Sequence, residues 1–110
     1  MIRWWRSPAP QPSGPPIERL AADLRRLLRL HDELAASAHA GLCAHRLWAV
    51  EAAIAMRAIE AATALGVRHP PASRADRLTP SELSILLAEL GAAGLAIPGR
   101  FGRFTTDGRL

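Results

Sequence analysis

Lysine, asparagine and tyrosine are absent from this chain of 110 residues, and cysteine occurs once. One thiol, Cys43, excludes an internal disulfide and cannot form the ligand set of a structural zinc site. No apolar run reaches the roughly 20 residues of a transmembrane helix, and the N-terminus lacks the apolar segment of a signal peptide. These absences favour a cytoplasmic protein, with membrane contact limited to its periphery.

Because lysine is absent, all 14 basic residues are arginine, and the net charge is +4. Arginine, alanine, proline and glycine have GC-rich codons, whereas lysine, asparagine and tyrosine have AT-rich ones. The arginine content therefore indicates a GC-rich bacterial genome, and it is not by itself a sign of nucleic-acid binding.

The first 16 residues have the composition of a tail. Trp4 and Trp5 stand between arginines, a composition that favours membrane interfaces, and they predict at most a weak contact with a membrane surface. Residues 7–16 hold five prolines, which predicts an extended linker. We expect residues 1–16 to be disordered.

Leucines and other apolar residues then recur at spacings of three and four, which predicts an amphipathic helix over about 17–38. Gly41 is the expected end of this helix and the expected turn. A second apolar face predicts a helix over about 42–65, and the short connection implies that the two helices are antiparallel. Gly66 is expected to end the second helix.

Residues 66–78 contain prolines and are expected to form a loop. Thr79, Pro80 and Glu82 then match an N-cap, a first helical position and a capping box. They predict a third, shorter helix over about 79–93. The segment 99–110 is expected to be either a short hairpin or a flexible tail. The fold class is therefore all-α: an antiparallel helical hairpin with a third helix, in one domain over 17–98.

Two polar residues interrupt the apolar faces of the predicted hairpin. His31 falls near the middle of the first face, and Glu51 near the middle of the second. In an antiparallel hairpin, residues at equal distance from the turn lie at one level, and 31 and 51 are equidistant from Gly41. An unpaired buried carboxylate is costly. We therefore predict a His31–Glu51 contact; the alternatives are a Glu51–Arg pair or an exposed Glu51.

Motifs that would indicate catalysis or cofactor binding are missing. There is no Ser/His/Asp arrangement, phosphate-cradling loop or His-Glu-x-x-His sequence. His39, Cys43 and His45 cluster near the predicted turn, but Cys43 and His45 would point about 200° apart on a helix. We therefore expect no enzyme, no metal and no cofactor.

Two resemblances add to these patterns. Residues 86–95 and 104–109 resemble the end of a winged-helix DNA-binding domain, which implies that Arg100, Arg103 and Arg109 contact nucleic acid. The sequence departs from that family because about a dozen residues separate the second and third helices. The stretches Pro15–Leu27 and Leu47–Ala53 resemble small uncharacterised helical proteins of high-GC actinobacteria, a resemblance that supports the fold and carries no site residues.

The sequence thus favours a helical protein–protein interaction module, either bound to a protein partner or self-associating as a homo-oligomer at micromolar concentration. A winged-helix DNA-binding protein using the helix 79–93 and the Arg/Gly tail is the alternative.

Overall fold

The computed structural model describes residues 16–36, 40–98 and 104. Four helices follow one another in it: α1 (Ile17–Ala36), α2 (Ala40–Leu65), the short 3-10 helix η1 (Ala72–Arg77) and α3 (Pro80–Ala92). The described residues contain no strand. The predicted all-α fold is confirmed, and the three expected helices begin and end within about two residues of their predicted bounds.

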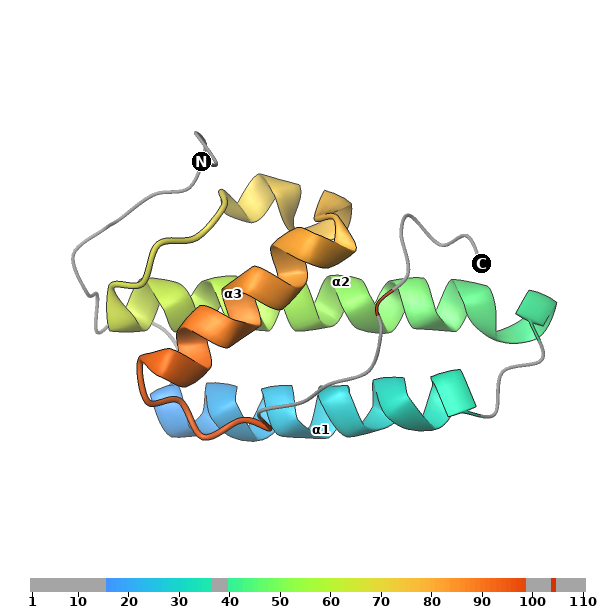
Figure 1. The fold of residues 1–110 in the computed structure, drawn as a ribbon, viewed down its shortest axis with the longest axis horizontal. Helices are drawn as coiled ribbons and strands as arrows, with labels where there is room; N and C mark the ends of the chain where they lie inside the picture. The colour runs from blue at the N-terminus through green and yellow to red at the C-terminus, as the bar shows by residue number, and fades with distance from the viewer. Residues whose placement is uncertain (1–15, 37–39, 99–103, 105–110) are drawn as a thin grey trace.

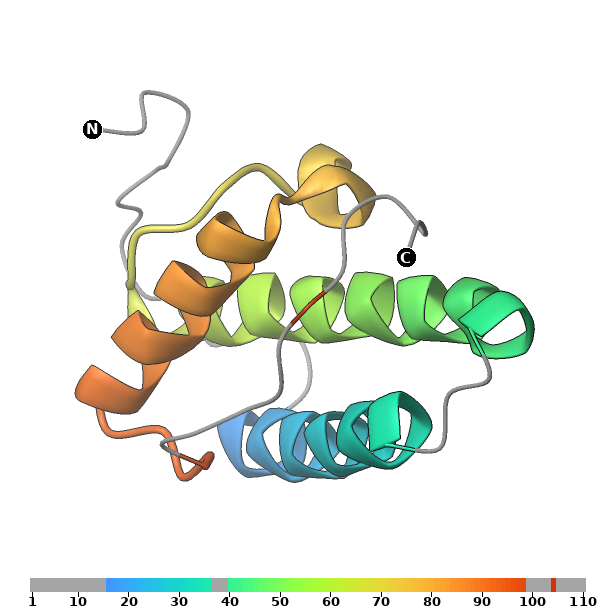
Figure 2. The same cartoon turned by 45° about the vertical axis from the view of Figure 1, so that its right-hand side comes forward.

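Helix α2 is the centre of the molecule. Helix α1 runs antiparallel beside it, and η1 and α3 also pack against it. Figures 1 and 2 show α3 crossing α2 at an angle, on one side of the α1–α2 hairpin. Every other element therefore depends on α2 for its position.

The composition of α2 explains how it accepts three neighbours. Ala55, Ala58, Ala61 and Ala62 are at most 1% exposed, and such small side chains let adjacent helices approach closely. Leucines from α1 and α3 fill the space around them. They are Leu20, Leu24, Leu28, Leu83, Leu86, Leu87 and Leu90. The core between these helices is therefore mostly leucine packed on alanine, together with Ile54 and Ile59 of α2.

The ends of the helices follow local chemistry. The carbonyl of Pro16 accepts hydrogen bonds from the first turn of α1. Gly66 has φ 72° directly after α2, and Val67 N–H donates to Ala62 O at 2.9 Å, which ends the helix where the sequence predicts. At α3, Thr79 and Glu82 form the predicted reciprocal capping box, with donor–acceptor distances of 2.9 and 3.1 Å.

Two local predictions were wrong. Gly41 lies inside the first turn of α2 and is neither the end of α1 nor the turn. Glycine is tolerated there because the first N–H groups of a helix have no intrahelical partner to lose. The segment 66–78 is only partly a loop, because residues 72–77 form η1 and bury Ala75 against α2.

Candidate functional site

The predicted polar pair is present at the centre of the hairpin. His31 on α1 and Glu51 on α2 approach to 2.7 Å between Nε2 and Oε2. They are 1% and 7% exposed. His31 continues the buried face of Leu24 and Leu28, and Glu51 continues that of Leu47. When Glu51 is ionised, Nε2–H of His31 is the donor. The pair joins the two apolar faces that it interrupts.

Phe104 covers the other side of the imidazole. Its ring centroid is 5.0 Å from that of His31 at an interplanar angle of 58°, and Phe104 is 6% exposed. From the sequence, 99–110 is expected to be a short hairpin or a flexible tail, and neither expectation predicted that Phe104 would be buried. A ring of this size buries enough apolar surface against the hairpin to offset its ordering. Among the described residues, His31 Nδ1 has no hydrogen-bond partner.

A small cavity adjoins Glu51. Its volume is about 20 Å³, which is room for about one water molecule. Its walls come from α2, from η1 and from the start of α3. They include Trp48, Ala55, Asp76 and Leu83. Through this cavity a substrate has little access to the carboxylate. The buried pair is therefore suited to holding two helices in register, and offers little room for chemistry on a ligand.

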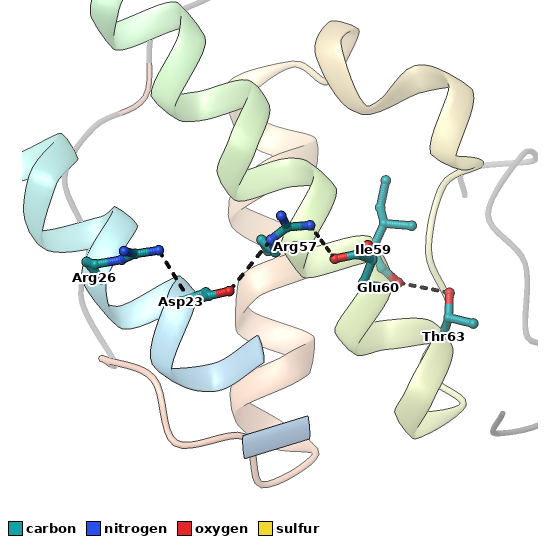
Figure 3. Close-up of polar contacts among 6 residues, drawn as sticks. All are labelled: Asp23, Arg26, Arg57, Ile59, Glu60 and Thr63. Atoms are coloured by element: carbon teal, nitrogen blue, oxygen red, sulfur yellow. Dashed lines mark hydrogen bonds and ion pairs between the residues drawn. The ribbon is translucent and has the colours of Figure 1, made fainter. Parts of the chain in front are cut away.

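Polar contacts on the surface also join α1 to α2, nearer the start of α1. Asp23 of α1 lies 3.8 Å from Arg57 Nε of α2, and Arg57 Nη1 donates to Glu60 at 2.6 Å. Arg26 adds a contact of 3.3 Å to Asp23. Figure 3 shows this chain of contacts on the near side of the two helices, with α3 behind them. Asp23 and Arg57 therefore mark the side of the hairpin that α3 leaves uncovered.

That side continues along both helices as an apolar surface. Leu27, Leu30 and Leu34 follow Asp23 at helical spacing on α1, and Val50 and Ala53 precede Arg57 at the same spacing on α2. We call these five residues the open face. Leu30 is 39% exposed, and the other four are partly buried. Leu27 and Val50 also pack against the core, and near Asp23 and Arg57 helix α3 lies on the other side of the hairpin (Figure 3).

A second concave region lies at the far end of the hairpin. It has a volume of about 330 Å³ and lies between the start of α1, the end of α2 and the turn after α3. Arg25 lines it, and its Nη1 donates to Ala96 O at 2.6 Å. This bond ties the segment after α3 to α1. The sequence offered no pattern that predicted it, because it joins residues 71 positions apart.

The structure does not describe most of the remaining candidates. Trp4, Trp5, Arg100, Arg103 and Arg109 lie outside the described residues. His45 is exposed and stacks on Trp48 at 6.1 Å, with no metal-binding group of three His, Cys, Asp or Glu in the part of the chain that is described. In the same part, none of the helices combines the length and apolar character that crossing a bilayer requires.

Comparison with family models, curated proteins and solved structures finds no match to this chain. The resemblances to winged-helix domains and to actinobacterial helical proteins therefore stay predictions. A functional proposal must rest on the geometry of the hairpin.

Proposed function

We propose that this chain is a helical protein–protein interaction module that binds its partner through the open face of the α1–α2 hairpin. The observation that carries the proposal is the exposure of Leu30 at the centre of an apolar stripe. Leu30 is flanked by Leu27 and Leu34, one turn away on each side. An amphipathic helix laid along this stripe would bury all three leucines.

The build of the molecule supports this role. The His31–Glu51 pair holds α1 and α2 at fixed levels, so their outer faces form one rigid surface. Met56 and Ile85 are as exposed as Leu30, at 40% and 43%, but Ile85 lies on α3, away from the open face. Single exposed apolar side chains are ordinary on protein surfaces. The distinguishing feature of Leu30 is its continuity with apolar neighbours on two helices.

The winged-helix alternative has less support. A helix-turn-helix joins its helices by a turn of three or four residues. Here α2 and α3 are separated by residues 66–79, which include η1. This connection favours the interaction module.

A photo-crosslinking experiment tests the proposal. A benzophenone amino acid replaces Leu30 in one variant and the equally exposed Ile85 in a control, both expressed in the native host. Irradiation should yield a covalent adduct with a polypeptide from position 30 and none from position 85. No adduct from position 30, or equal adducts from both, would overturn the proposal.

A further inference from the structure

On α1, a charged residue and a leucine lie about one turn before Leu30, and another charged residue and leucine lie about one turn after it. Arg26 and Leu27 precede it by four and three residues, and Glu33 and Leu34 follow it by three and four. At about 100° per residue, the two leucines lie on the flank toward α2 and the two charged residues on the opposite flank. Burial agrees with this, since both leucines are partly buried and both charged residues are exposed.

We propose that the partner on the open face is a second copy of this chain, with the two α1 helices antiparallel about a two-fold axis through Leu30. The inference rests on the interaction role proposed above and names its partner. In an antiparallel pair related by such an axis, residues on the same flank of the two helices meet when they lie at nearly equal distances before and after the axis. Arg26 then meets Glu33 of the second copy, Leu27 meets Leu34, and Leu30 meets its own counterpart.

Charge selects this arrangement over a parallel one. A two-fold axis generates each contact twice, so the antiparallel dimer gains two Arg–Glu pairs from one pattern. A parallel pairing in register would instead place the charged flank of each helix against the leucine flank of the other, and Arg26 and Glu33 would gain no charged partner. Arg26 contacts Asp23 at 3.3 Å, but with its side chain 69% exposed that contact is weak enough for a new partner to share the guanidinium.

The second helix fits the same axis. Asp23 on α1 contacts Arg57 on α2, so these two residues lie at one level of the hairpin. Leu30 lies seven residues after Asp23, and Val50 lies seven residues before Arg57. Because the helices are antiparallel, Leu30 and Val50 also lie at one level. The axis that passes Leu30 therefore also passes Val50. The two α2 helices would face each other there through Val50 and Ala53, whose small side chains permit close approach. The assembly is a four-helix bundle made of two hairpins that stack face to face.

Disulfide trapping tests the axis directly. Leu30→Cys is made with Cys43→Ser, so that each chain carries one thiol. A residue on a two-fold axis lies close to its own counterpart, within the Cα separation that a disulfide bridges. Mild oxidation should convert most of this variant to a covalent dimer. Ile85→Cys in the same background is the matched control, and it should stay monomeric although its site is more exposed.

Charge reversal tests the register. Arg26→Glu and Glu33→Arg should each weaken the dimer by about tenfold, because two attractive contacts become repulsive. The double variant Arg26→Glu/Glu33→Arg should restore the wild-type dissociation constant. Sedimentation equilibrium measures these constants, and circular dichroism confirms that each variant keeps its helices.

The second copy is overturned if Leu30→Cys oxidises no faster than Ile85→Cys, or if the double reversal fails to restore association. The results that would overturn the dimer differ from the results that would overturn the proposed interaction module. A crosslink from position 30 to a different polypeptide, with a monomeric Leu30→Cys protein, would retain the open face as a binding surface and remove the second copy. No crosslink at all would remove both.

Discussion

His31 and Glu51 are polar groups at positions where each helix otherwise presents leucine or alanine. A buried carboxylate or imidazole without a partner would be costly, but at 2.7 Å Glu51 and His31 Nε2 are partners of each other. Sliding one helix past the other by a turn would separate them by about 5 Å and break this hydrogen bond. The pair therefore penalises every register except the observed one, which is a role well attested for buried polar residues.

The thermodynamics of this pair can be measured by a double-mutant cycle. Glu51→Ala should lower the free energy of unfolding by about 3 kcal/mol, because it leaves a buried imidazole without its partner. The double variant His31→Leu/Glu51→Ala should be more stable than Glu51→Ala, since the buried imidazole is then no longer stranded. Urea unfolding of the four proteins gives the coupling. Small and equal losses from both single variants would show that the side chains are solvated.

Phe104 contributes apolar contact to the same centre. Phe104→Ala should lower the unfolding free energy by about 3 kcal/mol, the usual loss for a buried phenylalanine. Phe104→Leu keeps most of the volume and serves as the matched control, with a loss of about 1 kcal/mol. Urea denaturation measures both. If Phe104→Ala unfolds at the wild-type urea concentration, the ring does not pack on His31.

At the scale of helices, the sequence predicts the features that neighbouring residues determine, such as helix starts and apolar faces. Thr79, Pro80 and Glu82 place the start of α3 because three independent preferences agree at one residue. The His31–Glu51 contact follows from two helical wheels and an antiparallel turn, even though Gly41 turned out to lie inside α2. His31 and Glu51 meet because the apolar faces of the two helices pack against each other in this register. The position of Gly41 does not change that packing.

The features that the sequence did not predict lie in segments without a periodic apolar pattern, or depend on contacts between distant segments. The six residues of η1 are too few to establish an apolar repeat, and only Ala75 among them is buried. Phe104 follows a segment rich in glycine and arginine, where an aromatic residue outside any periodic pattern gives no indication of what it packs against. The Arg25–Ala96 bond joins distant segments through a backbone carbonyl, which any residue type could offer. Such contacts depend on the tertiary arrangement alone.

The capping box of α3 gives a prediction for a single element. Thr79→Ala should lower the unfolding free energy by about 1 kcal/mol, because the amide of Glu82 loses its acceptor. Ser81→Ala, two residues further and exposed, is the control and should change stability by less than about 0.5 kcal/mol. Thermal or urea unfolding distinguishes them. Equal effects from the two variants would mean that the cap contributes nothing to α3.

For the whole molecule, the most exposed residue of the open face, Leu30, lies outside the core, whereas Leu27 and Val50 of that face also pack against it. The core between α1, α2 and α3 is closed by leucines that are at most 3% exposed, whereas Leu30 on the open face is 39% exposed. A chain of this size buries a limited apolar area within one copy. Covering the open face with a second copy would add buried area without changing the packing inside either hairpin.

This separation predicts how stability depends on protein concentration. A dimer that forms only from folded chains stabilises the folded state by mass action, so the unfolding midpoint should rise as concentration increases. Leu30→Glu should abolish that rise, because it would bring two carboxylates together on the two-fold axis. At low concentration, where the wild type is monomeric, the two proteins should unfold within about 0.5 kcal/mol of each other, since position 30 lies outside the core.

Differential scanning calorimetry over a hundredfold range of concentration measures both effects. A wild-type midpoint that does not move would mean that the folded chain remains a monomer, and a Leu30→Glu protein that is unstable at every concentration would place Leu30 in the core of the single hairpin.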